Sequence, residues 1–398
     1  MRKDKCDNMK FGYFCNPQDP GAARDWLEMM NEVRDLAVFC DDAGFDSFWL
    51  AEHHFNHRGI YILPNPVVMA TDLASRTKRI RIGLGAAIIT FWHPLRLAED
   101  LAMLDQLSEG RLEIGVGRGN FGIEGVNLNS KADPRDQKAN FEVFAETLEI
   151  IKRAFSQQLF SFEGKHYTFP TAGFTWDRHT VKDAEYVDPE TNELRKLTII
   201  PRTRQQPHPP IWQVVDSASS VEFAGRNDIG IIMWRPPADM LRERFRLYQD
   251  SAATVGKKRP LGSRCGITRD TFVAETKEKA RELCEKYLIR FLNYHNWRGP
   301  KIYLHPGEQY SSEQEERLKS SLDYDFVQRS VLVGSPEEVI DRIEELREVS
   351  GVEQILINSS WEGIPHELTM RSMKLFADKV LPKVQGTTSS AGLGTAAE

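Results

Sequence analysis

Three histidines at the end of a short apolar segment are the residues of this sequence best suited to proton chemistry. Residues 45–51 are typical of a buried strand, and the chain then runs through Glu52, His53 and His54, with His57 just beyond. Buried imidazoles need polar partners, and their pKa near neutrality suits general acid–base catalysis. Two structural histidines with satisfied nitrogens are the alternative interpretation of this pair.

A metal centre is the second chemistry that these histidines allow. His54 and His57 are three positions apart, and Glu52 is close to both. However, His53 and His54 are sequence neighbours that face opposite ways on an extended strand. No second segment rich in carboxylates completes a ligand set for zinc or iron. We therefore expect no metal, and a metal hydrolase is the less favoured alternative.

Strand-like apolar runs alternate with amphipathic helical patterns along the chain. A run and a following helix repeat in an even rhythm, which favours a (β/α)8 TIM barrel over a doubly wound sheet. The predicted strands are residues 10–15, 45–51, 79–90, 112–117, 211–215, 229–234, 266–274 and 354–358.

Two segments interrupt this alternation and predict insertions in the barrel. Residues 156–210 follow the fourth predicted helix and contain a hairpin pattern near Gly164, whereas residues 295–325 follow the seventh helix. We expect a single barrel domain over residues 1–384. The stretch 385–398 is rich in Gly, Ser, Thr and Ala, which predicts a disordered tail.

The composition excludes several classes of function. The formal net charge of -6 gives no general attraction to nucleic acid, and no apolar run is long enough to span a bilayer. The charged N-terminus is not followed by an apolar signal core. The five cysteines include no Cys-x-x-Cys pair, so we expect reduced thiols in a cytoplasmic protein.

A phosphate site is predicted where active-site groups of a barrel gather, at the C-terminal ends of its strands. Gly115-Val-Gly-Arg-Gly119 allows close approach of an anion, and Arg118 offers a bidentate fork. Ser217 and Ser220 stand at a predicted helix start, where free amides favour anions, although neighbouring Asp216 opposes a phosphate. Glycines that only turn the chain and a serine that only caps its helix are the alternatives.

Aromatic residues also follow several predicted strands. Trp92, His93, Trp234 and Trp361 are candidates for an aromatic substrate pocket, and core positions would suit the tryptophans equally well.

The combination of motifs resembles that of the bacterial luciferase-like flavin monooxygenase family over nearly the whole chain. The motifs are Ala51-Glu-His-His-Phe55, His93-Pro-Leu-Arg-Leu-Ala-Glu99, Leu104-Asp-Gln-Leu-Ser-Glu-Gly-Arg111, Gly115-Val-Gly-Arg-Gly119 and Gly334-Ser-Pro-Glu-Glu-Val339. The resemblance implies a (β/α)8 barrel with insertions. It also places His53 at the family's catalytic histidine, with His54 completing the catalytic pair.

The same resemblance assigns a flavin site residue by residue. Arg118, Ser217 and Ser220 match residues that hold the flavin phosphate, and Arg135 matches a second phosphate arginine across a different spacing. An acidic residue at the position of Asp216 is tolerated in luciferase, which has a glutamate there. Ala86 and Ala87 fall where the chain passes the isoalloxazine ring.

The function implied is that of a two-component monooxygenase. A separate NAD(P)H:flavin reductase would supply reduced FMN, which activates O2 as a flavin peroxide to oxygenate a small organic substrate. The family further implies a homodimer and a mobile lid at residues 295–325, for which an uninvolved surface insertion is the alternative. A deazaflavin- or FMN-dependent oxidoreductase without oxygen insertion and a non-catalytic flavin-binding paralogue are the alternatives.

Overall fold

The computed structural model describes residues 9–21, 23–176, 183–296 and 299–385. The predicted disordered tail lies outside these residues, apart from Gln385. Hydrogen bonds join the parallel strands in the order β10-β9-β11-β1-β2-β3-β4-β7-β8, and β8 also pairs with β9. This order closes a parallel barrel with helices between its strands, which confirms the predicted (β/α)8 class. No described helix is both long and apolar enough to cross a membrane.

The chain forms two compact units, which are described separately below. Unit 1 comprises residues 9–20, 25–47 and 215–385, and unit 2 comprises residues 21–24 and 48–214.

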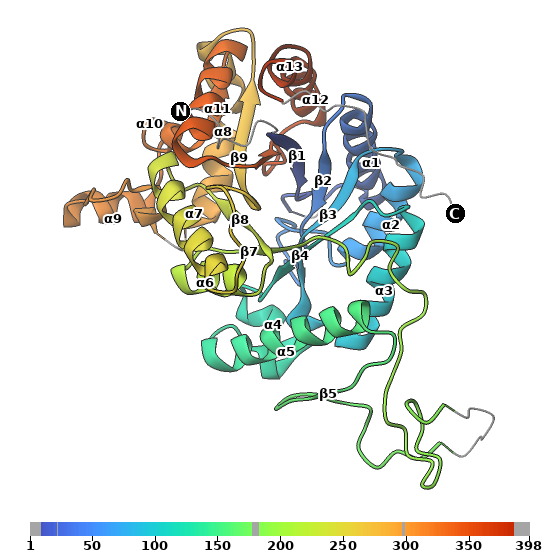
Figure 1. Cartoon of the computed structure of the whole chain (residues 1–398). Coiled ribbons are helices and arrows are strands. Elements are labelled where there is room, and N and C mark those ends of the chain that lie inside the picture. Colours follow the sequence, from blue (N-terminus) through green and yellow to red (C-terminus); the bar gives the residue numbers. More distant parts are fainter. Residues whose placement is uncertain (1–8, 22, 177–182, 297–298, 386–398) are drawn as a thin grey trace. The chain divides into compact units, whose positions relative to one another are not determined.

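Unit 2 contains the sheet that carries the histidine pair (Figure 1). Its strands pair in the order β2, β3, β4 and β7, and helices follow the first three of them. The strands are β2 (Ser47–Leu50), β3 (Arg81–Ile88), β4 (Leu112–Gly117) and β7 (Ile211–Val214), and the helices are α2 (Pro66–Arg76), α3 (Pro94–Leu107), α4 (Gly122–Leu128) and α5 (Gln137–Ser156).

The core of unit 2 is built around the buried indole of Trp49. A Cβ atom on Gly83 would lie 2.2 Å from the Trp49 ring, and one on Gly115 would lie 1.9 Å from the Leu84 carbonyl oxygen. The ring of Trp212 meets Trp49 edge-on, with centroids 6.2 Å apart. Glycines in two neighbouring strands therefore make room for one large aromatic side chain, as close packing requires.

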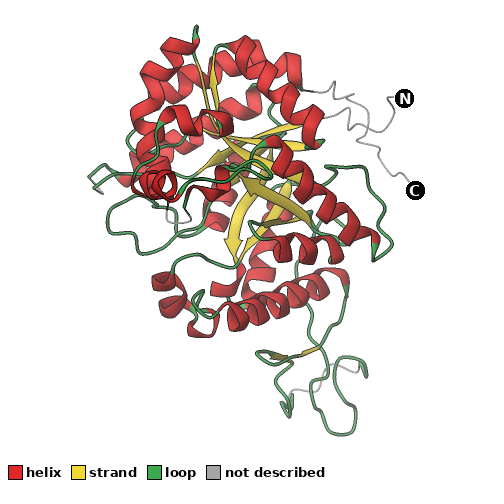
Figure 2. Cartoon of the chain, turned by 90° about the vertical axis from the view of Figure 1, so that its left-hand side faces the viewer, coloured by secondary structure: helices red, strands yellow, loops and turns green. Residues whose placement is uncertain are grey.

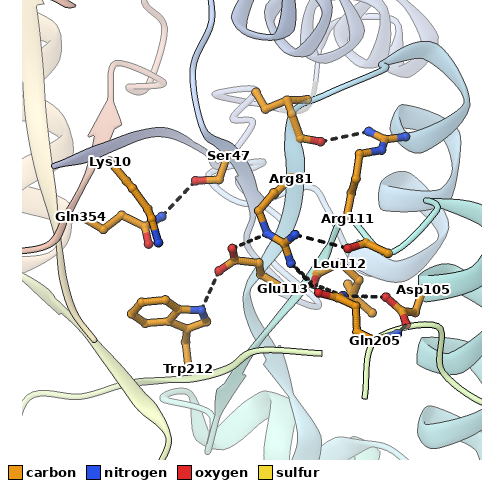
Figure 3. A network of polar contacts seen from close by, with 12 residues as sticks. Lys10, Ser47, Arg81, Asp105, Arg111, Leu112, Glu113, Gln205, Trp212 and Gln354 are labelled. Atoms are coloured by element: carbon orange, nitrogen blue, oxygen red, sulfur yellow. Dashed lines mark hydrogen bonds and ion pairs between the residues drawn. The ribbon is translucent and has the colours of Figure 1, made fainter. Parts of the chain in front are cut away.

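A polar network joins the strand starts of unit 2 (Figure 3). Arg81 donates from Nε to Oε1 of Glu113 over 2.6 Å, and the Trp212 indole donates to the other carboxylate oxygen of Glu113 over 2.6 Å. Arg81 also donates to Gln205, whose amide donates to Asp105. In a barrel, polar contacts at this end of the strands serve stability rather than catalysis.

The segment between α5 and β7 extends away from the strands of its own unit (Figures 1 and 2). It contains the expected hairpin, in which β5 (Phe162–Glu163) pairs antiparallel with β6 (Thr168–Phe169). Residues 177–182 of this segment lie outside the described ranges.

Unit 1 holds the remaining barrel strands, in the order β8, β9, β11 and β1. A short strand, β10, pairs with the C-terminal end of β9. The strands are β1 (Lys10–Cys15), β8 (Gly230–Trp234), β9 (Cys265–Val273), β10 (Leu332–Gly334) and β11 (Gln354–Asn358). The helices are α1 (Trp26–Asp42), α6 (Ala218–Arg226), α7 (Ala238–Ala253), α8 (Lys277–Tyr294), α11 (Pro336–Ser350), α12 (His366–Leu375) and α13 (Leu381–Val384), with a π-helical turn at Phe376–Val380.

The described part of the segment predicted as a lid contains short helical elements. They are η4 (Pro300–Tyr303), α9 (Ser312–Ser320) and α10 (Tyr324–Val327). Buried Tyr303, Leu318 and Tyr324 join them to the hydrophobic cluster around α8. Residues 297 and 298 lie outside the described ranges, and mobility of this segment stays a prediction.

Candidate functional site

The carboxylate of Glu52, just beyond β2, organises the start of the histidine segment. It is 2 % exposed, and it accepts hydrogen bonds from the Ile88 N–H over 2.8 Å and from the Trp92 indole over 3.0 Å. Its Oε1 atom also lies 2.9 Å from Nε2 of His54. The loops after β2 and β3 are thus joined through one buried acid. The sequence interpretation considered Glu52 only as a possible metal ligand.

His53 has a different environment from its neighbour. Its ring stacks on Tyr61, with centroids 4.0 Å apart, and packs at a tilt against Phe121 at 5.8 Å. The buried Nδ1 atom has no hydrogen-bond partner among the described residues, and Oε1 of Glu124 lies 3.5 Å away. The predicted alternation holds, because His54 points to Glu52 whereas His53 points to Tyr61 and Glu124.

Glu124 is the acid that the sequence interpretation missed. It lies in α4 and is 2 % exposed, and its Oε1 atom accepts a hydrogen bond from the His54 N–H over 2.8 Å. The same Oε1 atom lies 3.5 Å from Nδ1 of His53, so the two neighbouring histidines share one buried carboxylate.

The C-terminal half of β3 is irregular at Ala86. The peptide bond between Gly85 and Ala86 is cis, and the register between β3 and β4 shifts between Leu84 and Ala87. Bulges of this kind often stand beside active sites, because they change the direction of the strand. Both alanines are buried. A role for Ala86 and Ala87 beside a flavin ring stays a prediction.

Arg118 follows β4 and is half-buried without an acidic partner among the described residues. Its Nη2 atom donates to Gln137 over 3.3 Å, and its guanidinium lies 5.8 Å from the ring centroid of Phe141. Burial lowers the pKa of this guanidinium. A partly desolvated cation without a counter-ion has the donor chemistry that a phosphate needs.

The glycines beside Arg118 are explained by packing. Gly119 has a φ of 79°, and a Cβ there would lie 2.5 Å from Cζ of Phe91. A Cβ on Gly117 would lie 2.9 Å from Cδ1 of Ile88. The sequence interpretation connected these glycines with the approach of an anion, whereas the structure shows side chains that leave no room for a Cβ.

Arg135 forms an ion pair with Asp133. It is paired with Asp133 through several hydrogen bonds, of which the shortest spans 2.6 Å. Its side chain is 73 % exposed.

The predicted serine cluster lies in unit 1, at the start of α6. Ser217 caps the helix by accepting from the Ser220 N–H over 3.2 Å, and its hydroxyl lies 3.0 Å from that of Ser220. The exposed Asp216 precedes this cap. The capping role that we weighed for Ser217 is therefore present, and binding of a phosphate by the same hydroxyl groups stays a prediction.

The four candidates for a substrate pocket differ in their surroundings. Trp92 is held by Glu52, and exposed His93 meets Phe169 with ring centroids 5.6 Å apart. In unit 1, Trp361 is 2 % exposed and donates to Asp270 over 3.1 Å, which makes it a core residue. Half-buried Trp234 packs against Phe14.

The described residues contain no group of three His, Cys, Asp or Glu side chains arranged to hold a metal ion.

Comparison with known families and proteins gives a consistent result. The model of a family described as luciferase-like monooxygenase matches residues 9–354. The alkanal monooxygenase alpha chain of the Kryptophanaron alfredi symbiont is 25 % identical over 94 % of this chain and 98 % of its own length. The oxygenase component of the flavin-dependent trigonelline monooxygenase of Acinetobacter baylyi is 25 % identical over 94 % of this chain and 95 % of its own length.

Solved structures share the fold. The oxygenating constituent of 3,6-diketocamphane monooxygenase from Pseudomonas putida, in complex with FMN, has a TM-score of 0.74 at 22 % identity, over 94 % of this chain and 98 % of that chain. The coenzyme F420 dependent tetrahydromethanopterin reductase from Methanopyrus kandleri has a TM-score of 0.68 at 18 % identity, over 95 % of this chain and 100 % of that chain. The barrel is therefore shared by proteins that use different cofactors.

Proposed function

Because the chain belongs to the luciferase-like monooxygenase family, we propose that it is a flavin-dependent monooxygenase. It would take reduced FMN from a separate NAD(P)H:flavin reductase and use O2 to oxygenate a small organic substrate. Bound reduced flavin would supply the electrons that activate O2. The observation that carries the proposal is the environment of His53, whose ring makes no hydrogen bond and faces buried Glu124.

In this proposal His53 transfers a proton during oxygenation. Stacking on Tyr61 fixes the plane of the ring, and Phe121 packs against it at a tilt. The carboxylate of Glu124 lies 3.5 Å from Nδ1. The Nε2 atom then serves as the acid or base toward the reacting groups. His54 has a positioning role, since Glu52 holds its Nε2 and Glu124 holds its N–H.

Two groups of residues have the chemistry to bind the FMN phosphate. Arg118 supplies a half-buried guanidinium without an acidic partner, and a phosphate would compensate its charge. Ser217 and Ser220 supply hydroxyl groups at the N-terminus of α6, where the helix dipole favours an anion. We assign each group to the phosphate separately, so that single variants test each assignment by itself.

An anaerobic titration with reduced FMN is the first test of this proposal. Wild type is compared with Arg118→Met and Ser217→Ala, and with Arg96→Met as a control, because Arg96 is a 69 % exposed arginine on α3. Loss of a charge-assisted contact of about 1.5–3 kcal/mol predicts that Arg118→Met weakens binding by about 10- to 100-fold, whereas the control binds like wild type. Absence of binding to the wild-type protein would contradict the proposal.

Mixing the loaded protein with aerated buffer then tests the role of His53. His53→Ala should bind reduced FMN as wild type does, but it should release hydrogen peroxide faster, because without substrate every flavin oxidised yields one peroxide in either protein and only the rate can differ. Equal rates of flavin oxidation and peroxide release in both proteins would remove His53 from the proposed chemistry.

A deazaflavin-dependent oxidoreductase without oxygen insertion is the second candidate. It is supported by the shared fold of the F420-dependent reductase. The same titration with reduced F420 distinguishes the two, since the monooxygenase assignment predicts tighter binding of reduced FMN. A homodimer, which the family resemblance also implies, is tested by light scattering on the purified protein.

A further inference from the structure

Unit 1 contains two buried arginines beside one buried acid. Arg235 is the first residue after β8, and Arg269 and Asp270 are neighbours in β9. Their exposed fractions are 6 %, 2 % and 3 %, respectively. Asp270 is the only acidic partner of either arginine among the described residues. The cluster therefore holds a positive charge that no described acid neutralises, which is costly away from water.

The two arginines differ in how their donors are used. Arg269 donates to the carbonyl oxygens of Pro236 and Thr268, which is a structural role. The Nε and Nη2 atoms of Arg235 are buried and have no hydrogen-bond partner among the residues that the structure describes. Its Nε lies 3.6 Å from Oδ2 of Asp270, which is an ion pair beyond hydrogen-bond distance.

Asp270 is occupied by other donors. Its Oδ1 atom accepts from the Asn358 amide over 2.8 Å and from the Trp361 indole over 3.1 Å. Asn358 in β11 and Trp361 in the loop after it thus fix the carboxylate. At this position the carboxylate is too far from Arg235 to accept a hydrogen bond from its Nε atom. An arginine used purely for structure looks different: Arg111 in unit 2 donates to the carbonyl oxygens of Ala74 and Ile80.

The surroundings of Arg235 indicate a ligand with an apolar body. Its φ is 66°, an uncommon conformation for a non-glycine residue that it shares with Asp228 and Arg264 in the same unit, so the surroundings of the side chain carry the argument. The guanidinium lies 5.0 Å from the ring centroid of Trp234 and 5.6 Å from that of Phe291. The hydroxyl of Tyr303 is also buried without a partner. Burial raises the pKa of Tyr303 to about 12, and the charge of Arg235 counteracts this shift.

We infer that Arg235 and Tyr303 bind the oxyanion of an organic substrate, a carboxylate or a sulfonate attached to an aromatic or apolar body. Position supports this assignment, because groups directly after barrel strands line the active site in this architecture. That the bound anion is the substrate rests on the proposed monooxygenase function. Binding of the anion needs no flavin, so it is tested separately.

Calorimetric titration of the full chain without flavin is the test. The probes are benzoate, benzenesulfonate and neutral benzamide, and the proteins are wild type, Arg235→Met, Tyr303→Phe and the control Arg242→Met on the exposed side of α7. We expect at least tenfold tighter binding of one anion than of benzamide to wild type. Arg235→Met should remove this preference, Tyr303→Phe should weaken it several-fold, and the control should keep it.

Several outcomes would overturn the inference. Equal binding of the anions and benzamide to wild type is one, and undiminished anion binding by Arg235→Met is another. Loss of reduced-FMN binding in Arg235→Met, with anion binding intact, would assign Arg235 to the flavin phosphate instead. If Arg235→Met does not fold, Arg235→Lys and Tyr303→Phe provide the same comparison. Failure of wild type to bind reduced FMN would contradict the proposed function and leave the anion result standing.

Discussion

Nε2 of His54 lies 2.9 Å from a buried carboxylate oxygen of Glu52. The same carboxylate holds the Ile88 amide and the Trp92 indole, so it connects the histidine segment to the end of β3. The two adjacent histidines therefore have different surroundings. One ring is fixed by hydrogen bonding, and the other is held by aromatic contacts that leave its nitrogens available.

Glu52 and His54 should be strongly coupled in stability. Removing the carboxylate in Glu52→Ala leaves buried donors unpaired, so we expect a loss of about 2–4 kcal/mol in the free energy of unfolding. A double-mutant cycle of Glu52→Gln and His54→Ala, followed by urea unfolding, should give an interaction energy of about 1–3 kcal/mol. Additive effects of the two substitutions would mean that the contact contributes no coupling.

His53 should affect activity much more than stability. We expect His53→Gln to unfold within about 1 kcal/mol of wild type, because its ring makes no hydrogen bond, and to lower oxygenation by about 10²–10⁴-fold. Glu124→Gln should lower the rate of oxygenation and leave reduced-FMN binding unchanged, since the Glu124 carboxylate lies 3.5 Å from Nδ1 of His53. An oxygenation rate equal to that of wild type would remove Glu124 from this role.

Gly119 should be intolerant of alanine for two separable reasons. Its φ of 79° disfavours any side chain, and a Cβ would lie 2.5 Å from Cζ of Phe91. Gly44 provides the matched control, because its φ is 85° and nothing lies within 4 Å of its Cβ position. We expect Gly44→Ala to cost about 1–2 kcal/mol and Gly119→Ala to cost more.

The contact with Phe91 can be tested independently of the backbone. The double variant Gly119→Ala with Phe91→Leu should lose less stability, relative to Phe91→Leu alone, than Gly119→Ala loses in the wild type. Thermal unfolding measures both differences. Equal losses in the two backgrounds would show that the backbone conformation alone excludes alanine.

Stability should fall above pH 9 because of buried thiols. Burial raises the pKa of Cys15 from 9.0 to about 12 and raises that of Cys284 as well. The unfolded thiol loses its proton near pH 9 while the folded thiol keeps it. Stabilisation is therefore complete below pH 9 and is lost as the pH rises toward 12, by about 1.4 kcal/mol per thiol at pH 10.

Urea unfolding of wild type and Cys284→Ala at pH 7.5 and pH 10 measures this effect. The variant lacks one titrating thiol, so its loss of stability between the two pH values should be smaller by about 1.4 kcal/mol. The same slope in both proteins would show that Cys284 titrates alike in the folded and unfolded states.

The repeating pattern of the chain was sufficient to predict the barrel. The predicted bounds of 10–15, 112–117 and 354–358 are those of β1, β4 and β11. The predicted strand at 79–90 is shorter in the structure, because η1 (Ile89–Phe91) turns the chain after β3. The short strand β10 and helix α4 were missed, since three and seven residues carry too little periodicity to be recognised.

The site was predictable only where one residue type suggests its own chemistry. The histidine pair and Arg118 were predicted in this way, and their roles stay predictions. Glu124 was not, because its relation to His54 joins positions that are 70 residues apart and depends on the fold. The environment of Arg235 could not be predicted either, because a sequence does not show which arginines have a hydrogen-bond acceptor in the fold.

The network of Arg81, Glu113 and Trp212 has a consequence for protein engineering. It ties together the starts of β3, β4 and β7, whereas the β3 bulge and Arg118 stand at the C-terminal ends of β3 and β4, and Glu52 follows the C-terminal end of β2. The polar network and the candidate site residues therefore come from different stretches of unit 2. Loops grafted from relatives onto the C-terminal strand ends should leave the network at the strand starts intact, which makes this unit a suitable host for chimeras with altered substrate range.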